Sequence, residues 1–187
     1  VTGDFCPACA ESILDAAERL KSENRVRWLI VGDGRMAAWV KEEVIRRGLQ
    51  NTFILLGRYS LDRMPSFYKH AHALLVSLKQ DPVLAMTIPG KIQSYLAFGV
   101  PIIGMLDGEG ARVVEEAGAG LTCPAGNSKG LADTVLKMSK MSDEDRLRMS
   151  SNGKLYSQRE FDRNLLIRKL EGFLENIGSI APTALNT

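Results

Sequence analysis

The segment around Lys91 carries the residues best suited to chemistry in this chain. Pro89-Gly90 breaks the backbone, and Lys91 follows at the start of an apolar, helix-forming run that Gly99 ends. This pattern predicts a lysine and several open backbone amides at a helix N-terminus, which is a favourable place for an anion. A lysine fixed there suits a phosphate or a diphosphate. The same spacing also fits an ordinary α/β crossover with a surface lysine.

The cysteines are a second candidate. Cys6-Pro7-Ala8-Cys9 is a C-x-x-C motif, which is compatible with a thioredoxin-like redox site. A zinc site would need two further ligands, for which Cys123, His70 and His72 are scattered candidates. Because short motifs of this kind often arise by chance, we interpret the thiols as incidental and the histidines as packing or surface residues. The odd number of cysteines favours a reducing compartment.

The third candidate is a glycine-rich turn. Gly32-Asp33-Gly34-Arg35-Met36-Ala37 follows a predicted strand and fits the G-x-G-x-x-A fingerprint of nicotinamide-dinucleotide sites. However, Asp33 would lie close to the pyrophosphate, and the next strand ends in Gly57-Arg58 rather than in an acidic residue for the ribose. An arginine there would suit a 2′-phosphate. The nicotinamide interpretation is therefore kept as an alternative.

Strands and helices are predicted to alternate along the chain and to position these motifs. Short apolar runs typical of buried strands occupy residues 26–31, 52–56, 73–76, 102–103 and 120–123. Helical patterns occupy residues 10–21, 36–45, 61–69, 90–98 and 108–117, and then 131–138, 143–156 and 161–174. This order predicts an α/β fold with a Rossmann-like, doubly wound parallel sheet and extra C-terminal helices.

Ligands of such sheets bind outside the carboxyl ends of the strands. The loops predicted at that edge span residues 3–9, 32–36, 57–61, 77–91 and 104–111. The connection from Ser77 to Gly90 is long for an α/β fold, and long loops often have a function. We therefore expect the binding residues in these loops.

Composition is that of an ordinary globular domain, with 187 residues, 45% hydrophobic residues, 25% charged residues and a net charge of +2. The charge is too small to indicate a nucleic-acid partner. No apolar run approaches the roughly 20 residues of a membrane span. The start at Val1, without an initiator methionine, suggests a fragment of a longer protein. We assign residues 1–178 to one domain and residues 179–187 to a disordered tail.

Four stretches resemble one known family in their order and spacing. They are residues 31–34 (Val-Gly-Asp-Gly), residues 53–57 (Phe-Ile-Leu-Leu-Gly), residues 88–91 (Ile-Pro-Gly-Lys) with the run up to residue 103, and residues 118–121 (Gly-Ala-Gly-Leu). They are similar to the C-terminal, nucleotide-sugar-binding half of retaining GT-B glycosyltransferases of group 1, above all those of bacterial surface-polysaccharide assembly. The resemblance implies one half of a GT-B fold and transfer of a sugar, with retention, to a polysaccharide or lipid-linked acceptor.

The resemblance also implies a role for each motif. The loop at Arg58-Tyr59 would hold the base, largely through its backbone. Ile88-Pro89-Gly90-Lys91 would face the diphosphate, and Lys91 would be the catalytic cation that stabilises the leaving group. Gly108 and Glu109 would lie near the phosphates or the sugar. Typical members need no metal, so we expect no cofactor and a nucleotide-sugar donor, with UDP chosen over GDP by resemblance.

The chain departs from the family pattern at two places. Many members carry two glutamates, at the positions that Met86 and Ser94 occupy here. Ser94 offers the ribose only a hydroxyl, and the Met86 side chain offers the sugar no hydrogen bond. The first loop, residues 3–9, has no cation. Because the Pro-Gly-Lys subgroup often lacks the glutamates, activity is still expected, and a non-catalytic interaction module is the second alternative.

In the family, the active site lies between two domains, and this chain lacks the N-terminal acceptor domain. We therefore expect the fragment to bind nucleotide without turnover. The last helix would be partly bare at Phe161, Leu165 and Phe173, which would invite a homodimer. The parent enzyme would be cytoplasmic and, because polysaccharide assembly uses lipid carriers, would associate with the inner membrane as a peripheral protein.

Overall fold

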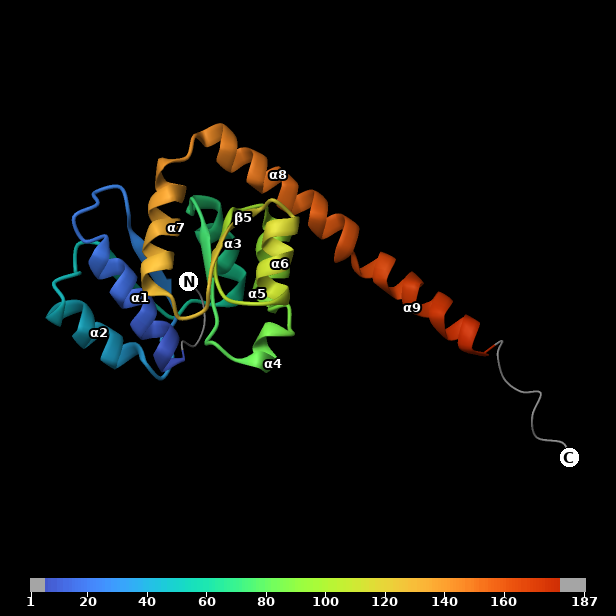
Figure 1. Ribbon diagram of the computed structural model, residues 1–187, viewed down its shortest axis with the longest axis horizontal. Helices are drawn as coiled ribbons and strands as arrows, with labels where there is room; N and C mark the ends of the chain where they lie inside the picture. Colours follow the sequence, from blue (N-terminus) through green and yellow to red (C-terminus); the bar gives the residue numbers. More distant parts are fainter. Residues whose placement is uncertain (1–5, 179–187) are drawn as a thin grey trace, which may run out of the picture.

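The computed structural model describes residues 6–178, in which parallel strands alternate with helices as far as α7 (Figure 1). The strands are β1 (Trp28–Val31), β2 (Phe53–Gly57), β3 (Leu74–Ser77), β4 (Ile102–Met105) and β5 (Gly120–Cys123). The helices are α1 (Pro7–Arg19), α2 (Ala37–Arg46), the 3-10 turn η1 (Leu61–Arg63), α3 (Met64–His70), α4 (Pro82–Ala85), α5 (Gly90–Phe98), α6 (Glu109–Glu116), α7 (Ser128–Lys140), α8 (Asp143–Glu160) and α9 (Arg163–Gly178). The tail predicted at residues 179–187 lies outside the described residues.

The strands pair in two parallel groups. β1 pairs with β2, and Trp28 lies opposite Phe53. β3, β4 and β5 pair in that order, with Leu74 opposite Ile102 and Ile102 opposite Gly120. Between β1 and β3 lies a cavity of about 480 Å³, whose lining includes residues of both strands. The described residues thus form a two-stranded and a three-stranded sheet side by side.

The two sheets share their hydrophobic layers. Ile30 of β1 and Leu75 of β3 belong to one buried cluster, which also contains side chains of α1, α2 and α7. Val31 and Leu74, one residue away in each strand, belong to a second cluster with side chains of α3, α5 and α6. Because successive strand residues point to opposite faces, the clusters lie on opposite sides of the strands. This confirms the predicted Rossmann-like α/β fold with helices on both faces.

Several predicted boundaries are wrong for local reasons. α1 begins at Pro7 rather than at residue 10, because Cys6 caps the helix and proline suits its first position. The long loop after β3 contains α4, which Asp81 caps by accepting a hydrogen bond from the Val83 amide at 2.9 Å. The helix predicted at residues 61–69 begins with the 3-10 turn η1.

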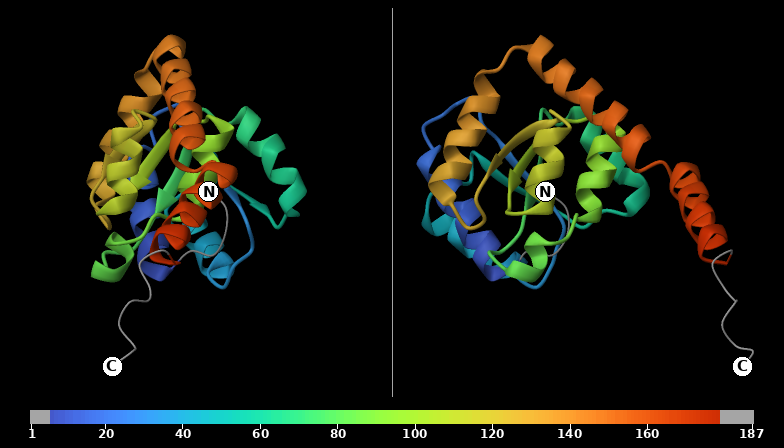
Figure 2. Two further views of the ribbon diagram at one scale, coloured as in Figure 1. Left: turned by 90° about the vertical axis from the view of Figure 1, so that its right-hand side faces the viewer. Right: turned by 45° about the vertical axis from the view of Figure 1, so that its right-hand side comes forward.

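The C-terminal helices leave the body of the domain. α8 packs along α5, and α9 then extends away from the sheets (Figures 1 and 2). Phe161 and Leu165 are half-buried, whereas the Phe173 side chain is 67% exposed. The expectation is wrong for Phe161, which ends α8 and packs against the second buried cluster, but α9 itself has a bare face, most clearly towards its end. None of the described helices combines the length and hydropathy needed to cross a bilayer.

Candidate functional site

Lys91 lies in the first turn of α5, where the sequence predicts it. Pro89 leads into the helix with an extended backbone (φ −58°, ψ 134°). Ile92, Tyr95 and Leu96 are fully buried and fix the helix against the sheet. Lys91 itself is half-buried. The structure therefore holds one cation at the N-terminus of a well-anchored helix.

The loop after β4 packs against the start of α5. Gly108 has a positive φ of 69°, and a Cβ atom on it would come within 2.0 Å of the Ala85 carbonyl oxygen. A Cβ atom on Gly110 would lie 3.2 Å from Cδ of Pro89. Only glycine permits the first of these contacts. The Ile88-Pro89-Gly90-Lys91 segment and the Gly108-Glu109 segment, both predicted from the sequence to face the donor, are thus brought together.

Glu109 is half-buried, and the first turn of α6 already gives its carboxylate a partner. The Arg112 guanidinium donates to Oε2 of Glu109 at 2.8 Å and is also paired with Glu116. This hydrogen bond from Arg112 holds the pKa of Glu109 below its usual range. A contact from Glu109 to a donor sugar stays a prediction, and its first-turn position is one that the helix dipole favours.

The two positions that depart from the family pattern also lie near α5. Ser94 is exposed one turn into the helix, and its hydroxyl donates to the Gly90 carbonyl at 3.1 Å. Met86 ends α4, and its side chain is 71% exposed. Ser94 keeps acceptor capacity for a ribose hydroxyl, whereas the Met86 side chain supplies none.

The start of α1 reaches the same end of the sheet, as predicted for the loop of residues 3–9. Cys9 lies near Ser77 at the end of β3, and it is close enough to Lys91 for the lysine charge to act on its thiol. Lys79, just beyond β3, forms an ion pair with Asp81 at 2.7 Å. This pair raises the pKa of Lys79 and lowers that of Asp81. A second lysine and the α1 terminus therefore border the Lys91 region.

Arg58 and Tyr59 lie beside the two-stranded sheet, apart from this cluster. They line an open pocket of about 860 Å³ together with Gly32-Asp33-Gly34 and Leu61. The Tyr59 ring packs edge-on against Phe67 with 4.8 Å between ring centroids. A base held by this loop stays a prediction.

The glycine-rich turn also borders a smaller pocket of about 390 Å³ between β1, β2 and α2. Gly32 donates its amide to the Gly57 carbonyl at 2.8 Å. α2 starts after Met36, whose side chain caps no amide. The turn therefore has the strand–turn–helix context of the dinucleotide fingerprint, but Asp33 is exposed at its tip.

The scattered metal candidates are not brought together. His70 and His72 flank the turn before β3, at its amino end, whereas Cys6 and Cys9 lie at its carboxyl end. Cys123 is buried at the end of β5, and burial raises its pKa to about 11. Within residues 6–178, no group of three or more histidine, cysteine or acidic side chains could hold a metal ion.

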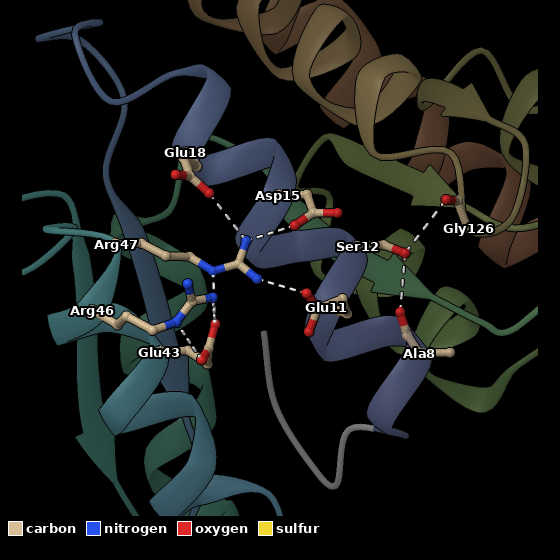
Figure 3. Close-up of polar contacts among 9 residues, drawn as sticks. All are labelled: Ala8, Glu11, Ser12, Asp15, Glu18, Glu43, Arg46, Arg47 and Gly126. Carbon is tan, nitrogen blue, oxygen red and sulfur yellow. Dashed lines mark hydrogen bonds and ion pairs between the residues drawn. The ribbon is translucent and has the colours of Figure 1, made fainter.

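A cluster of charged residues fixes α1, and sequence reasoning missed it. The Arg47 guanidinium, only 6% exposed, contacts Glu11, Asp15 and Glu18 of α1 at 2.6, 2.5 and 3.2 Å (Figure 3). It also contacts Glu43 of α2 at 2.9 Å. The acidic residues recur at helical spacing in α1, but nothing local to Arg47 identifies them as its partners. The cluster joins α1, the helix that begins near Lys91, to the two-stranded half of the domain.

Comparison with known proteins assigns this chain to a family. Residues 5–141, most of the chain, match the family model described as glycosyl transferases group 1. Among curated protein sequences, none matches the chain.

Solved structures share the fold. A glycosyltransferase from Rickettsia africae ESF-5 has a TM-score of 0.78 at 16% identity, covering 94% of this chain and 46% of that one. HepE from Anabaena, solved with UDP-glucose, has a TM-score of 0.76 at 17% identity, covering 94% and 47%. TarM from S. aureus, solved with UDP and alpha-GlcNAc-glycerol, has a TM-score of 0.77 at 13% identity, covering 91% and 34%. This chain therefore spans less than half the length of these structures. It belongs to the group 1 glycosyltransferase family.

Proposed function

We propose that this domain binds the nucleotide-sugar donor of a retaining glycosyltransferase, with UDP as the nucleotide. The observation that carries the proposal is the half-buried Lys91 in the first turn of α5, where the loops after β3 and β4 meet. HepE and TarM, which share the fold, were solved with UDP-glucose and with UDP. The family match supports the same class of donor.

In this proposal, the diphosphate lies at the N-terminus of α5. The amides of Gly90 and Lys91 point towards it, and the Lys91 ammonium supplies the nearest fixed positive charge. When the bond between the sugar and the diphosphate breaks, negative charge grows on the leaving phosphate. A fixed cation stabilises that charge more than it stabilises the ground state, and losing one such contact generally costs about 3 kcal/mol of barrier. The step as proposed uses no metal ion.

The sugar of the donor would lie towards Gly108 and Glu109, beside α6. The acceptor, a polysaccharide or a lipid-linked saccharide, would bind to a separate N-terminal domain of the parent enzyme. The domain on its own would then bind nucleotide without turnover. Assembly on a lipid carrier would place the parent enzyme in the cytoplasm, at the inner membrane.

One observation favours a second candidate, a non-catalytic module that keeps the fold without the ligand. At the position where many members carry a sugar-binding glutamate, Met86 is 71% exposed and carries no polar group. A nicotinamide site at the Gly32-Asp33-Gly34 turn is the remaining alternative. Binding of UDP, of NADH or of neither distinguishes the three.

The test is a calorimetric titration of this chain with UDP, GDP and NADH. We expect saturable UDP binding in the micromolar to millimolar range, weaker GDP binding and none for NADH. Lys91→Ala should weaken UDP binding about tenfold or more, because a charge-assisted hydrogen bond contributes about 1.5–3 kcal/mol. Lys140→Ala is the matched control, since Lys140 is exposed at the end of α7, and it should bind UDP normally. NADH binding, or UDP binding that survives Lys91→Ala unchanged, would contradict the proposal.

A further inference from the structure

Cys6 and Cys9 form a close pair at the N-terminus of α1. Cys6 is the cap residue, with an extended backbone, and Pro7 occupies the first helical position. The Cys9 amide donates to Sγ of Cys6 at 3.2 Å. Positions three apart on a helix have Cβ atoms about 5–6 Å apart, and the extended cap residue turns its sulfur back over the first turn. A disulfide needs Cβ atoms about 3.5–4.5 Å apart, so the pair can close once the cap residue Cys6, which lies outside the helix, shifts towards Cys9.

The two thiols differ in access. Cys6 is half-buried, whereas Cys9 is only 5% exposed. Burial, reinforced by the hydrogen bond and charge of Cys6, raises the pKa of Cys9 to about 12. In a dithiol that exchanges with small disulfides, the exposed thiol reacts first with the incoming disulfide. The buried thiol then attacks the exposed one and releases the small thiol.

Two lysines lie near the pair. The charges of Lys91 and Lys79 act on the thiols, although Lys79 is also paired with Asp81 at 2.7 Å. Reactive cysteines are found in such partly exposed, electropositive places at helix N-termini. Cys123 differs from Cys6, since it is buried at 7% exposure and the charge that acts on its thiol is that of Asp107. Cys123 therefore serves as an internal control.

We infer that Cys6 and Cys9 are a redox-active dithiol that exchanges with low-molecular-weight disulfides. The Cys6 thiolate attacks one sulfur of the small disulfide, forming a mixed disulfide and releasing the first small thiol. Cys9 then attacks Sγ of Cys6, passing its proton to the departing sulfur, and the second small thiol leaves. The protein loses two electrons and two protons, and the small disulfide becomes two thiols.

The experiment equilibrates the native chain with mixtures of reduced and oxidised glutathione, followed by acid quenching, alkylation and peptide mass analysis. We expect one transition to a species lighter by two hydrogens, with Cys6 and Cys9 linked and Cys123 still reduced. The oxidised fraction of the protein is set by the concentration of oxidised glutathione divided by the square of that of reduced glutathione. For this two-electron exchange, the fraction should rise from a tenth to nine tenths over about a hundredfold change in that quantity. The circular dichroism spectrum should be the same for the reduced and the oxidised protein, because the first turn of α1 is already helical before the disulfide forms.

Two variants identify the order of attack. In Cys9→Ser, the mixed disulfide with glutathione should accumulate on Cys6. In Cys6→Ser, Cys9 should stay reduced, as Cys123 does. The inference would be overturned if native wild-type protein formed no internal disulfide at any ratio, carried glutathione on Cys6 alone, or formed only disulfides between chains. The wild-type result decides the question even if a variant folds poorly.

Discussion

The two sheets end in contrasting surfaces. At the carboxyl end of the three-stranded sheet, the loops close on one another, with Gly108 against Ala85 and Gly110 against Pro89. At the two-stranded sheet, an open pocket of about 860 Å³ is bordered by exposed side chains such as Leu61, which is 87% exposed. A leaving group that gains charge benefits from donors fixed in advance. If the donor binds as proposed, its phosphates would meet loops that are already packed, and its base would meet an open pocket.

The largest expected effect separates two glycines that both have positive φ. Gly108→Ala should lower the free energy of unfolding by about 2–5 kcal/mol, because the added Cβ is strained and also meets the Ala85 carbonyl. Gly57→Ala, at φ 74° with nothing within 4 Å of the added Cβ, should cost only about 1–2 kcal/mol. Urea unfolding of both variants measures the difference. Equal losses would mean that the three-stranded end is no more tightly packed than the other.

The Arg47 cluster joins α1 to α2. Removing it should have the next largest effect on stability. Arg47→Met should lower the thermal unfolding midpoint by several degrees, since each kcal/mol shifts it by about 2–4 °C in a domain of this size. Arg46→Met is the control, because the Arg46 side chain is 66% exposed and contacts Glu43 alone. Similar shifts for both variants would contradict a special role for Arg47.

The same cluster predicts a pH dependence. Hydrogen bonds from Arg46 and Arg47 lower the pKa of Glu43 to about 2, from 4.5. A carboxylate whose pKa is lowered in the folded state stabilises the fold above its unfolded pKa, and this contribution is lost as the pH falls towards 2. Thermal unfolding between pH 5.5 and 2.5 should therefore show a steeper loss for wild-type protein than for Glu43→Gln. If the unfolding midpoints of the two proteins fall in parallel with pH, Glu43 does not contribute to the acid sensitivity of the fold.

A smaller effect concerns backbone dynamics. β4 is paired on both sides, whereas β1 pairs with β2 alone among the described strands. We expect the amides of β4 to exchange with deuterium about tenfold more slowly than those of β1, because opening β4 breaks two ladders. Exchange of β1 as slow as that of β4 would show that the two sheets have equal local stability.

The smallest effect is expected at Arg58. Its side chain is exposed, and the base is expected to contact the backbone of this loop. Arg58→Ala should change UDP affinity by less than about threefold, which is under 1 kcal/mol. A tenfold loss of UDP affinity, measured by calorimetry, would show that the open pocket at Arg58 contributes a charged contact. The two ends of the site would then not differ in the way proposed.

Local patterns predicted the elements of the fold well. Apolar runs located all five described strands, and Pro89-Gly90 and Gly99 marked both ends of α5. α4 was missed because four residues show no helical period, although Asp81-Pro82 is a recognisable start signal. The arrangement of the strands in two sheets could not be predicted, because the pairing of parallel strands depends on contacts distant in sequence.

The candidate site could be predicted only in part for the same reason. Lys91 and the Gly108 loop could be identified from the residues that flank them in the sequence. The approach of Cys9 to Ser77 and Lys91, and of Arg47 to three acidic residues of α1, depends on how α1 packs across the sheets. Residue types alone carry no signal for these long-range pairs.

The most direct test of the central claim compares UDP with uridine as ligands of wild-type protein and Lys91→Ala. If Lys91 faces the diphosphate, the substitution should weaken UDP binding about tenfold or more and leave uridine binding unchanged, because uridine has no phosphate. An equal loss for both ligands would show that Lys91 supports the fold or the base site. No loss for either would show that the diphosphate does not bind at the N-terminus of α5.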